Sequence, residues 1–142
     1  MRRDYFTVDF RLESDDGIPA IQIAYDGPPG GLRDRLASTA ESTLESSDID
    51  VAFRHRVEDD SGVLSVTDRV TGEFVFEVDA SVDRIEALVD VAQRRDGDGQ
   101  YEVRLTDTDS KSLVYDKQTL LVYDHDGSLL RERSLIPGSV EL

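Results

Sequence analysis

The chain has 142 residues and contains no cysteine and no tryptophan. The absence of cysteine excludes a disulfide framework and thiol chemistry. No apolar run approaches the roughly 20 residues that a membrane-spanning helix needs. The first residues carry two arginines but no apolar stretch of the kind found in a secretory signal. We therefore expect a cytoplasmic protein that does not enter a membrane, with one domain over residues 1–142.

Lysine is nearly absent, and positive charge is scarce. Thirty-one Asp and Glu oppose sixteen Lys and Arg, for a formal net charge of −15, and only Lys111 and Lys117 are lysines. Repulsion among these acids destabilises a compact chain in dilute buffer. In molar salt the Debye length falls to about 3 Å, so most of the repulsion is screened. The composition therefore predicts a halophilic protein whose acidic side chains form a hydrated surface.

Hydrophobic residues make up 38% of the chain and recur with regular periods, which favours a folded domain over disorder. Alternation of apolar and polar residues is typical of half-buried strands. The expected strands cover residues 5–13, 20–26, 49–57, 63–69, 73–79, 101–106, 113–115, 119–124 and 128–134. Most of the chain is thus expected to form β-structure.

Two helices are expected between these strands. Leu32, Leu36, Ala40 and Leu44 recur every four residues and predict a first helix. A second apolar stripe begins at Val82, after a capping residue, and ends before an Asp-Gly run. This order predicts an α+β domain, in which two helices pack on one face of an antiparallel sheet. The two halves also align over one strand-turn-helix unit, so a duplication of two ββαβ halves is an open alternative.

The Asp-rich loops at residues 96–99, 107–109 and 124–127 are the first places to look for a metal ion. A calcium loop needs about six to eight oxygens at fixed spacing and a closing bidentate Glu, which none of these loops supplies. Asp and Gly are also the residues that tight turns use. The Gly-Pro-Pro-Gly-Gly run at 27–31 lacks the Lys-Ser/Thr of a phosphate-binding loop. We expect turns in all four segments, and neither a metal nor a cofactor.

The only histidines are His55, on the apolar face of an expected strand, and His125, in an expected turn between two acids. Neither lies near a Ser or Cys in a recognisable nucleophile motif. A small enzyme or ligand-binding protein that uses His55 or His125 with nearby carboxylates is therefore an alternative, not the favoured interpretation.

Arginines on outward strand positions offer a candidate binding surface, provided that their strands are neighbours in one sheet. The candidate residues are Arg11, Arg54, Arg56 and Arg104, with Tyr5 beside them. Such a surface can bind an acidic peptide or a nucleic acid backbone. Cross-strand pairing with Asp9, Glu73 and Glu102 is the simpler interpretation. Nucleic acid is not expected as a partner, because phosphate binding weakens steeply with salt.

Three segments resemble a small family of uncharacterised haloarchaeal proteins. They are MRRDYFT at residues 1–7, VTGEF at 70–74, and the closing run from LVYDHDG at 121–127 to SLIP at 134–137. These motifs are strand and turn sequences, and the resemblance covers the whole chain. It implies a haloarchaeal cytoplasmic origin and carries over no activity and no functional residues.

The sequence thus predicts a non-enzymatic binding or assembly module of a halophilic cytoplasm, which recognises its partner by charge complementarity and aromatic contact. The expected edge strand at 128–134 is a template for pairing with another chain, so a protein partner or a homodimer is expected. Nucleic-acid binding through the arginine face is the third hypothesis.

Overall fold

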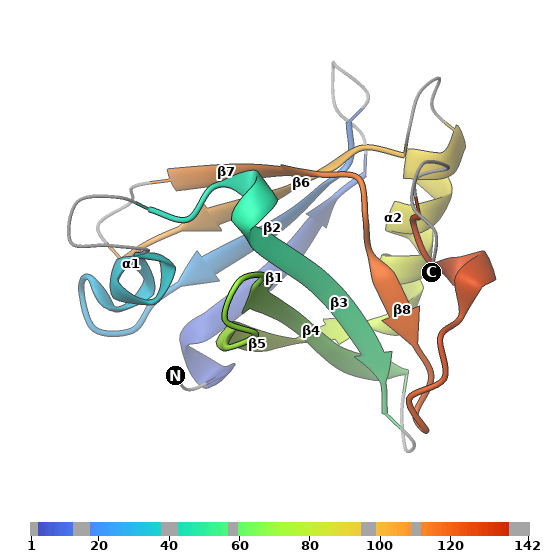
Figure 1. Cartoon of the computed structure of the whole chain (residues 1–142), viewed down its shortest axis with the longest axis horizontal. Coiled ribbons are helices and arrows are strands. Elements are labelled where there is room, and N and C mark those ends of the chain that lie inside the picture. The colour runs from blue at the N-terminus through green and yellow to red at the C-terminus, as the bar shows by residue number, and fades with distance from the viewer. Residues whose placement is uncertain are drawn as a thin grey trace.

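The computed structural model describes residues 3–12, 18–37, 43–56, 60–94, 99–108 and 112–136. They form two four-stranded sheets whose strands cross at a large angle (Figure 1). Sheet I has the order β1-β2-β6-β7 and contains β1 (Phe6–Arg11), β2 (Ala20–Tyr25), β6 (Tyr101–Thr106) and β7 (Ser112–Lys117). Sheet II has the order β5-β4-β3-β8 and contains β3 (Ile49–His55), β4 (Ser61–Asp68), β5 (Phe74–Ser81) and β8 (Leu121–Tyr123).

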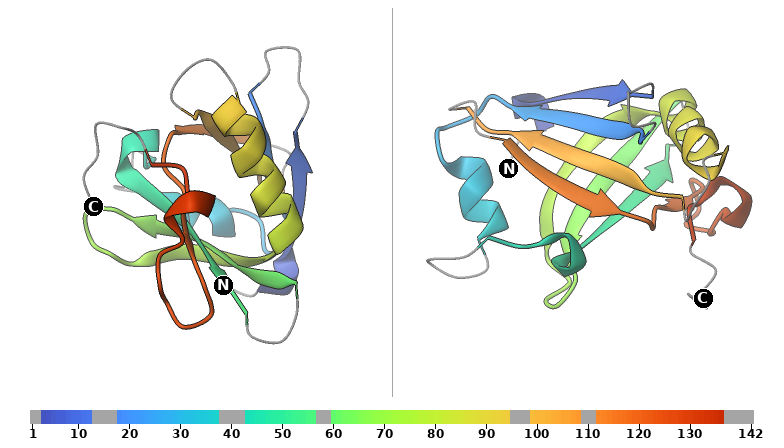
Figure 2. Two further views of the ribbon diagram at one scale, coloured as in Figure 1. Left: turned by 90° about the vertical axis from the view of Figure 1, so that its right-hand side faces the viewer. Right: turned by 90° about the horizontal axis from the view of Figure 1, so that it is seen from above.

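The helical elements are short, apart from one. They are α1 (Gly31–Leu36), α2 (Val82–Arg94) and the 3-10 turns η1 (Arg3–Tyr5), η2 (Ser46–Asp48) and η3 (Arg131–Arg133). The helices α1 and α2 lie at opposite ends of the two sheets (Figures 1 and 2). Each therefore covers one end of the space between the sheets.

Alternating strands build a core between the two sheets. In β6, Tyr101, Val103 and Leu105 are buried, whereas the residues between them are half-exposed. At one side of the molecule the outer strands of the two sheets meet, because Phe6 of β1 stacks on Phe76 of β5 with ring centroids 5.2 Å apart. The period-2 pattern of the sequence thus becomes one continuous hydrophobic core.

The expected α+β fold, with two helices on one face of a single antiparallel sheet, is wrong. The protein is mostly β, and each sheet contains one parallel pair, β2 with β6 and β3 with β8. The reason is the path of the chain: the segment that includes α1 leads from β2 in sheet I to β3 in sheet II, and the segment that includes α2 leads from β5 back to β6. Strands that alternate between sheets cannot form one antiparallel sheet.

The two proposed ββαβ halves are also not equivalent. In sheet I, β6 pairs with the second strand of the β1–β2 hairpin, in parallel. In sheet II, β3 pairs with the first strand of the β4–β5 hairpin, antiparallel. β3 and β6 are the last strands of the two proposed halves. If the halves were duplicates, these two strands would pair with corresponding strands of the hairpins and in the same orientation. The aligned strand-turn-helix pattern therefore reflects local structure only.

Two further expectations on elements are wrong. The first helix ends at Leu36, since Ala37 has an extended backbone and pairs with Thr43 in an isolated bridge. Leu44 is still buried, but from the returning chain, and Ala40 lies outside the described residues. The segment 128–134 is not a strand: it makes a bridge at Leu129 and then the 3-10 turn η3.

Candidate binding surface

The four candidate arginines lie on two different faces of the molecule. Arg11 on β1 and Arg104 on β6 belong to the outer face of sheet I. Arg54 on β3, and Arg56 just after it, belong to sheet II. The condition for a single arginine cluster, neighbouring strands, is therefore not met. Tyr5 lies in η1, and its ring meets that of Tyr25 edge-on with centroids 6.0 Å apart.

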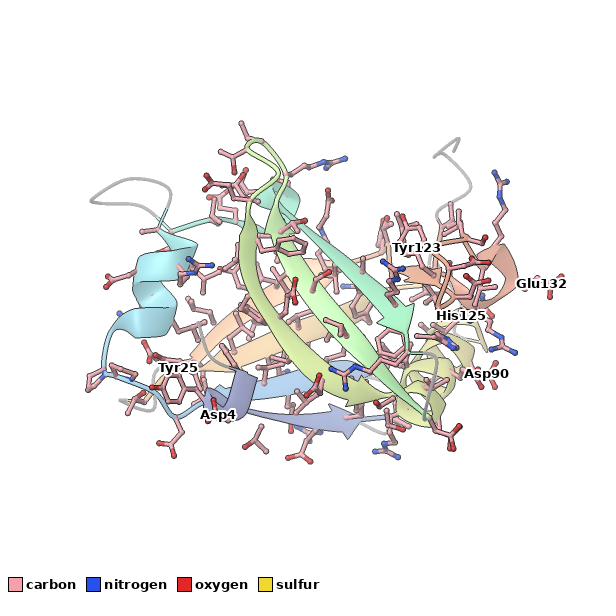
Figure 3. The ribbon with its side chains drawn as sticks, turned by 90° about the horizontal axis from the view of Figure 1, so that it is seen from below. Asp4, Tyr25, Asp90, Tyr123, His125 and Glu132 are labelled. Carbon is pink, nitrogen blue, oxygen red and sulfur yellow. The ribbon has the colours of Figure 1, made fainter. Side chains whose placement is uncertain are left out.

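Three of these arginines already have partners. Arg104 donates to Glu102 Oε1 at 2.6 and 2.9 Å from two of its nitrogens. Arg56 forms an ion pair with Asp79. Arg54 donates to the backbone carbonyl of His125 at 2.9 Å, on the side of the molecule that Figure 3 shows. Carboxylates thus offset the charges of Arg56 and Arg104, but not in the expected cross-strand pairs: Asp79 was not a predicted partner, and Glu102 lies on the same strand as Arg104.

Two further arginines, which the sequence analysis did not single out, bind carbonyls of edge strands. Arg35 of α1 donates to the carbonyls of Phe74 and Val75 on β5, both at 2.8 Å. Arg84 of α2 donates to the carbonyl of Phe10 on β1 at 3.1 Å. These donors satisfy carbonyls of the outermost strands, which otherwise are templates for another chain. Only the tertiary arrangement shows these roles, because each pairing joins residues far apart in the sequence.

The edge at β8 is covered by the segment that follows it. Leu120 and Leu135 exchange backbone hydrogen bonds of 3.0 and 2.9 Å. Leu130 donates to the carbonyl of Val122 at 2.8 Å, and Ser134 Oγ accepts from the amide of Val122 at 2.9 Å. The segment that was expected to be an exposed edge strand thus closes the edge of β8.

The edge at β7 is covered only at its end. The amide of Asp116 donates to Ser46 Oγ at 3.0 Å, so its backbone groups point away from β6. Since these groups alternate in direction along a strand, those of Ser112 and Val114 point the same way. Within the described ranges of the chain, no hydrogen bond reaches either residue at this edge. As far as the described residues go, the first half of β7 is thus an open edge.

The outer face of sheet I, which we call the open face, continues from this edge. The register aligns three rows of side chains across it: Thr7, Ala24, Thr106 and Ser112; Asp9, Gln22, Arg104 and Val114; and Arg11, Ala20, Glu102 and Asp116. The right-hand view of Figure 2 shows this sheet from above, with neither α1 nor α2 lying across it.

A hollow of about 370 Å³ lies on the open face. Its lining comes from all four strands: Thr7, Asp9, Gln22, Ile23, Ala24, Arg104, Thr106, Ser112 and Val114. The hollow exists because the first row consists of small side chains, whereas longer ones stand in the row beside it. Val114 lines this hollow and is 52% exposed. The site is therefore a mostly uncharged depression beside an open strand edge.

A second, larger hollow of about 570 Å³ contains His55. Its lining is His55, Asp124, Leu129, Leu130, Arg131, Glu132 and Arg133. His55 Nε2 is shielded from solvent, and no group among the described residues hydrogen-bonds it. Asp124 Oδ1 accepts the amides of Asp126 and Ser128, both at 3.1 Å. These two hydrogen bonds hold the turn together.

The acidic side chains are distributed over the surface. Of the Asp and Glu that the structure describes, only Asp107 is buried, with 5% of its surface exposed. One oxygen accepts the amide of Thr108 at 2.7 Å, and the other lies 3.6 Å from Arg33 Nε. In the described ranges, no three His, Asp or Glu side chains converge as metal ligands would. The loop at 96–98 and residue 109 lie outside the described residues.

None of the helices in the described ranges has the length and apolar character needed to span a bilayer. Over the described residues, fold and site define a class of protein: a two-sheet β protein with an uncovered sheet face beside an open stretch of strand edge at β7. The model of a family of unknown function, DUF5793, matches residues 1–142, and the chain belongs to that family. Searches of curated proteins and of solved structures found no match.

Proposed function

We propose that the protein is a non-enzymatic binding or assembly module, which takes a protein partner at the β7 edge and on the open face beside it. The observation that carries the proposal is the first half of β7. Its backbone groups at Ser112 and Val114 have no partner among the described residues, whereas the segment after β8 closes the β8 edge, Arg35 satisfies two carbonyls of β5, and the outer side of β1 packs on β5 through Phe6 and Phe76. An extended segment added to such an edge gains main-chain hydrogen bonds, and side-chain pockets give it specificity.

The chemistry of the open face favours a protein partner over an anion. Arg104 is neutralised by Glu102, and the hollow is lined mainly by Thr, Ser, Ala and Val side chains. A phosphate backbone needs a row of unpaired cations, and its binding weakens steeply with salt. Apolar contacts and backbone hydrogen bonds keep their strength at high ionic strength. The surface thus suits a partner that binds by shape and β-pairing.

We further propose a haloarchaeal, halophilic cytoplasm as its setting. The net charge of −15 supports this proposal, as does the position of the described acids, all of which except Asp107 keep contact with solvent. A coat of carboxylates is a suitable surface where salt screens their repulsion.

Site-specific photo-crosslinking in the cells that produce the protein tests the proposed surface. A photoreactive phenylalanine derivative replaces Val114 in one strain and Val70 in another. Val70 is the matched control, because it is 86% exposed but lies in the turn between β4 and β5 of sheet II. We expect a discrete protein adduct from position 114 and none from position 70.

Non-specific cross-linking would be stronger at position 70, because that position is the more exposed of the two. A stronger adduct at position 114 therefore indicates specific binding. Equal adducts at both positions, or none at position 114, would contradict the proposed binding surface. Circular dichroism in molar KCl checks that both variants keep the native fold.

A further inference from the structure

We propose that the partner at the open edge is a second copy of this chain, joined through antiparallel pairing of β7 with β7. This inference rests on the proposed function and identifies its partner. The pairing joins two copies of sheet I into one continuous eight-stranded sheet, with the two hollows side by side. In a two-fold symmetric dimer, both copies contribute the same surface. Two identical β7 edges that pair in antiparallel orientation satisfy this condition.

The register of the pairing follows from the groups that remain unsatisfied. Ser112 and Val114 point their backbone groups outward, whereas the amide of Asp116 is bound by Ser46 Oγ. Pairing Ser112 with Val114 of the partner subunit uses only open groups. The alternative, with Val114 at the axis, places Ser112 opposite an Asp116 that is already engaged. The first register therefore satisfies both open residues on each copy and breaks no existing hydrogen bond.

This register places the axis at Leu113, so that each Leu113 faces its counterpart. Leu113 points to the inner side of sheet I, opposite Leu105 on β6, and is only partly buried at the end of the core. Val114 on the other side is 52% exposed. β7 thus has an incompletely covered apolar side chain on each of its two faces. A second β7 strand would add packing contacts to both Leu113 and Val114.

Charge also favours a second copy at this place. Although the chain carries a net charge of −15, the residues from Ser112 to Tyr115 are uncharged. In the proposed register, Asp116 and Lys117 lie beyond the residues that pair. Like charges therefore do not stand opposite each other within the pairing segment, and the remaining repulsion between two acidic copies is screened in molar salt. An exposed, uncharged edge strand is also one that most proteins avoid, unless it is used.

Single cysteines test the register, because the chain has none of its own. Leu113→Cys places two thiols at a non-hydrogen-bonded antiparallel pair, whose Cα atoms are about 4.5 Å apart and within disulfide reach. Val114→Cys is the matched control, since its counterpart lies diagonally at about 7–8 Å, too far for a bridge. Under mild oxidation in molar KCl, we expect the mass of Leu113→Cys to double and Val114→Cys to remain a monomer.

Exposure alone would give the opposite order, because Val114 is the more exposed of the two residues. A Leu113→Cys variant that stays monomeric while its circular dichroism remains native overturns the inference, as does a Val114→Cys variant that cross-links faster. Light scattering of the unmodified protein should show a dimer whose population rises with KCl. Val114→Pro should abolish that dimer and keep the fold, because the amide of Val114 does not point toward β6.

The photo-crosslinking experiment separates the failure of this inference from that of the proposed function. An adduct of twice the chain mass at position 114 supports the homodimer. An adduct with a different protein there contradicts the homodimer and supports the proposed binding surface. The lack of any adduct at position 114 contradicts both.

Discussion

Several cationic side chains among the described residues bind main-chain carbonyls. Arg35, Arg54 and Arg84 each donate to a backbone carbonyl on a distant segment. Lys117, one of only two lysines, donates to the carbonyls of Ser46 and Ile49 at 2.8 and 2.6 Å. Burial lowers the pKa of Lys117, and the nearby Asp50 opposes that shift. These contacts use the scarce positive charge of the chain to hold the fold together.

Two buried tyrosines, Tyr101 and Tyr115, differ in whether their hydroxyl groups are hydrogen-bonded. The hydroxyl of Tyr101 donates to the carbonyl of Thr119 at 2.7 Å, whereas that of Tyr115 is buried, and no described group accepts its hydrogen bond. Burial raises the pKa of both, and that of Tyr115 reaches about 12, with a smaller contribution from Asp48. The two residues therefore form a natural pair of test positions.

We predict that Tyr115→Phe leaves stability at pH 7 unchanged or raises it by about 1 kcal/mol, because it removes an unsatisfied buried hydroxyl. Tyr101→Phe should cost about 1 kcal/mol, because it removes a hydrogen bond. In the unfolded chain Tyr115 loses its proton near pH 10, whereas in the folded chain it does so near pH 12. The raised pKa of Tyr115 therefore does not change the free energy of unfolding below pH 10. Between pH 10 and pH 12 it lowers the free energy of unfolding by about 2 kcal/mol, because the unfolded chain loses the proton first.

Urea unfolding in molar KCl at pH 7 and at pH 11 measures these changes. The alkaline loss should be smaller in Tyr115→Phe than in the unmodified protein. Equal alkaline losses in the two proteins, or a clear loss of stability in Tyr115→Phe at pH 7, would contradict the account of Tyr115.

At the scale of the element, the edges of the sheets are the parts that need protection. Arg35 spans from α1 to β5 and satisfies two carbonyls with one guanidinium group, a geometry that lysine cannot reproduce. We predict that Arg35→Met destabilises the fold by about 1–2 kcal/mol and that Arg35→Lys recovers only part of the loss. Urea unfolding in molar KCl gives both values.

Arg69→Met provides the control for the loss of a charge. Arg69 is exposed and lies 3.8 Å from Asp50, so its removal should change stability by less than about 0.5 kcal/mol. If Arg35→Met and Arg69→Met have equal effects, Arg35 contributes charge only and does not protect the edge.

Most strands and the β4–β5 hairpin could be predicted from the sequence, but the division of the strands between two sheets could not. Alternation places β1, β2 and β6 close to their observed bounds, because one side of each strand is buried whatever its neighbours are. The same alternation is compatible with one sheet or two. The division into two sheets depends on where the chain crosses after each helix, which no local pattern records.

The candidate site shows the same limit. Outward positions of Arg54 and Arg104 were predictable from strand parity, but their separation onto different sheets was not.

The apolar stripe from Leu32 to Leu44 gave a wrong prediction, that of a helix extending to Leu44, for a related reason. Leu44 returns to the core through a reversal of the chain, and the intervening Ser and Thr residues are poor helix formers. The open edge at Val114 had no sequence signal beyond an uncharged run.

The whole molecule carries its excess charge outside a small core. With −15 on the surface and one buried carboxylate among the described acids, repulsion acts on the folded state as a whole. We predict that the strand signal in circular dichroism is lost in dilute buffer and recovered in molar KCl. The Debye length falls from about 10 Å at 0.1 M to about 3 Å at 1 M, so the repulsion between exposed acids is screened much more strongly in molar salt.

A titration from 10 mM to molar KCl tests this dependence, with an equal ionic strength of a second salt as control. A native signal that does not change at 10 mM salt would contradict the prediction. A response to KCl but not to the second salt would show specific ion binding instead of screening.

The two parallel pairs also determine when the protein can fold during synthesis. Ala20 lies opposite Glu102, and Ala52 lies opposite Leu121, so each sheet takes a parallel strand from a segment made much later. Contacts of such high sequence separation slow folding. Until β6 and β8 have left the ribosome, β2 and β3 present bare edges in a crowded cell. Nascent chains of this protein should therefore depend on chaperones until translation is nearly complete.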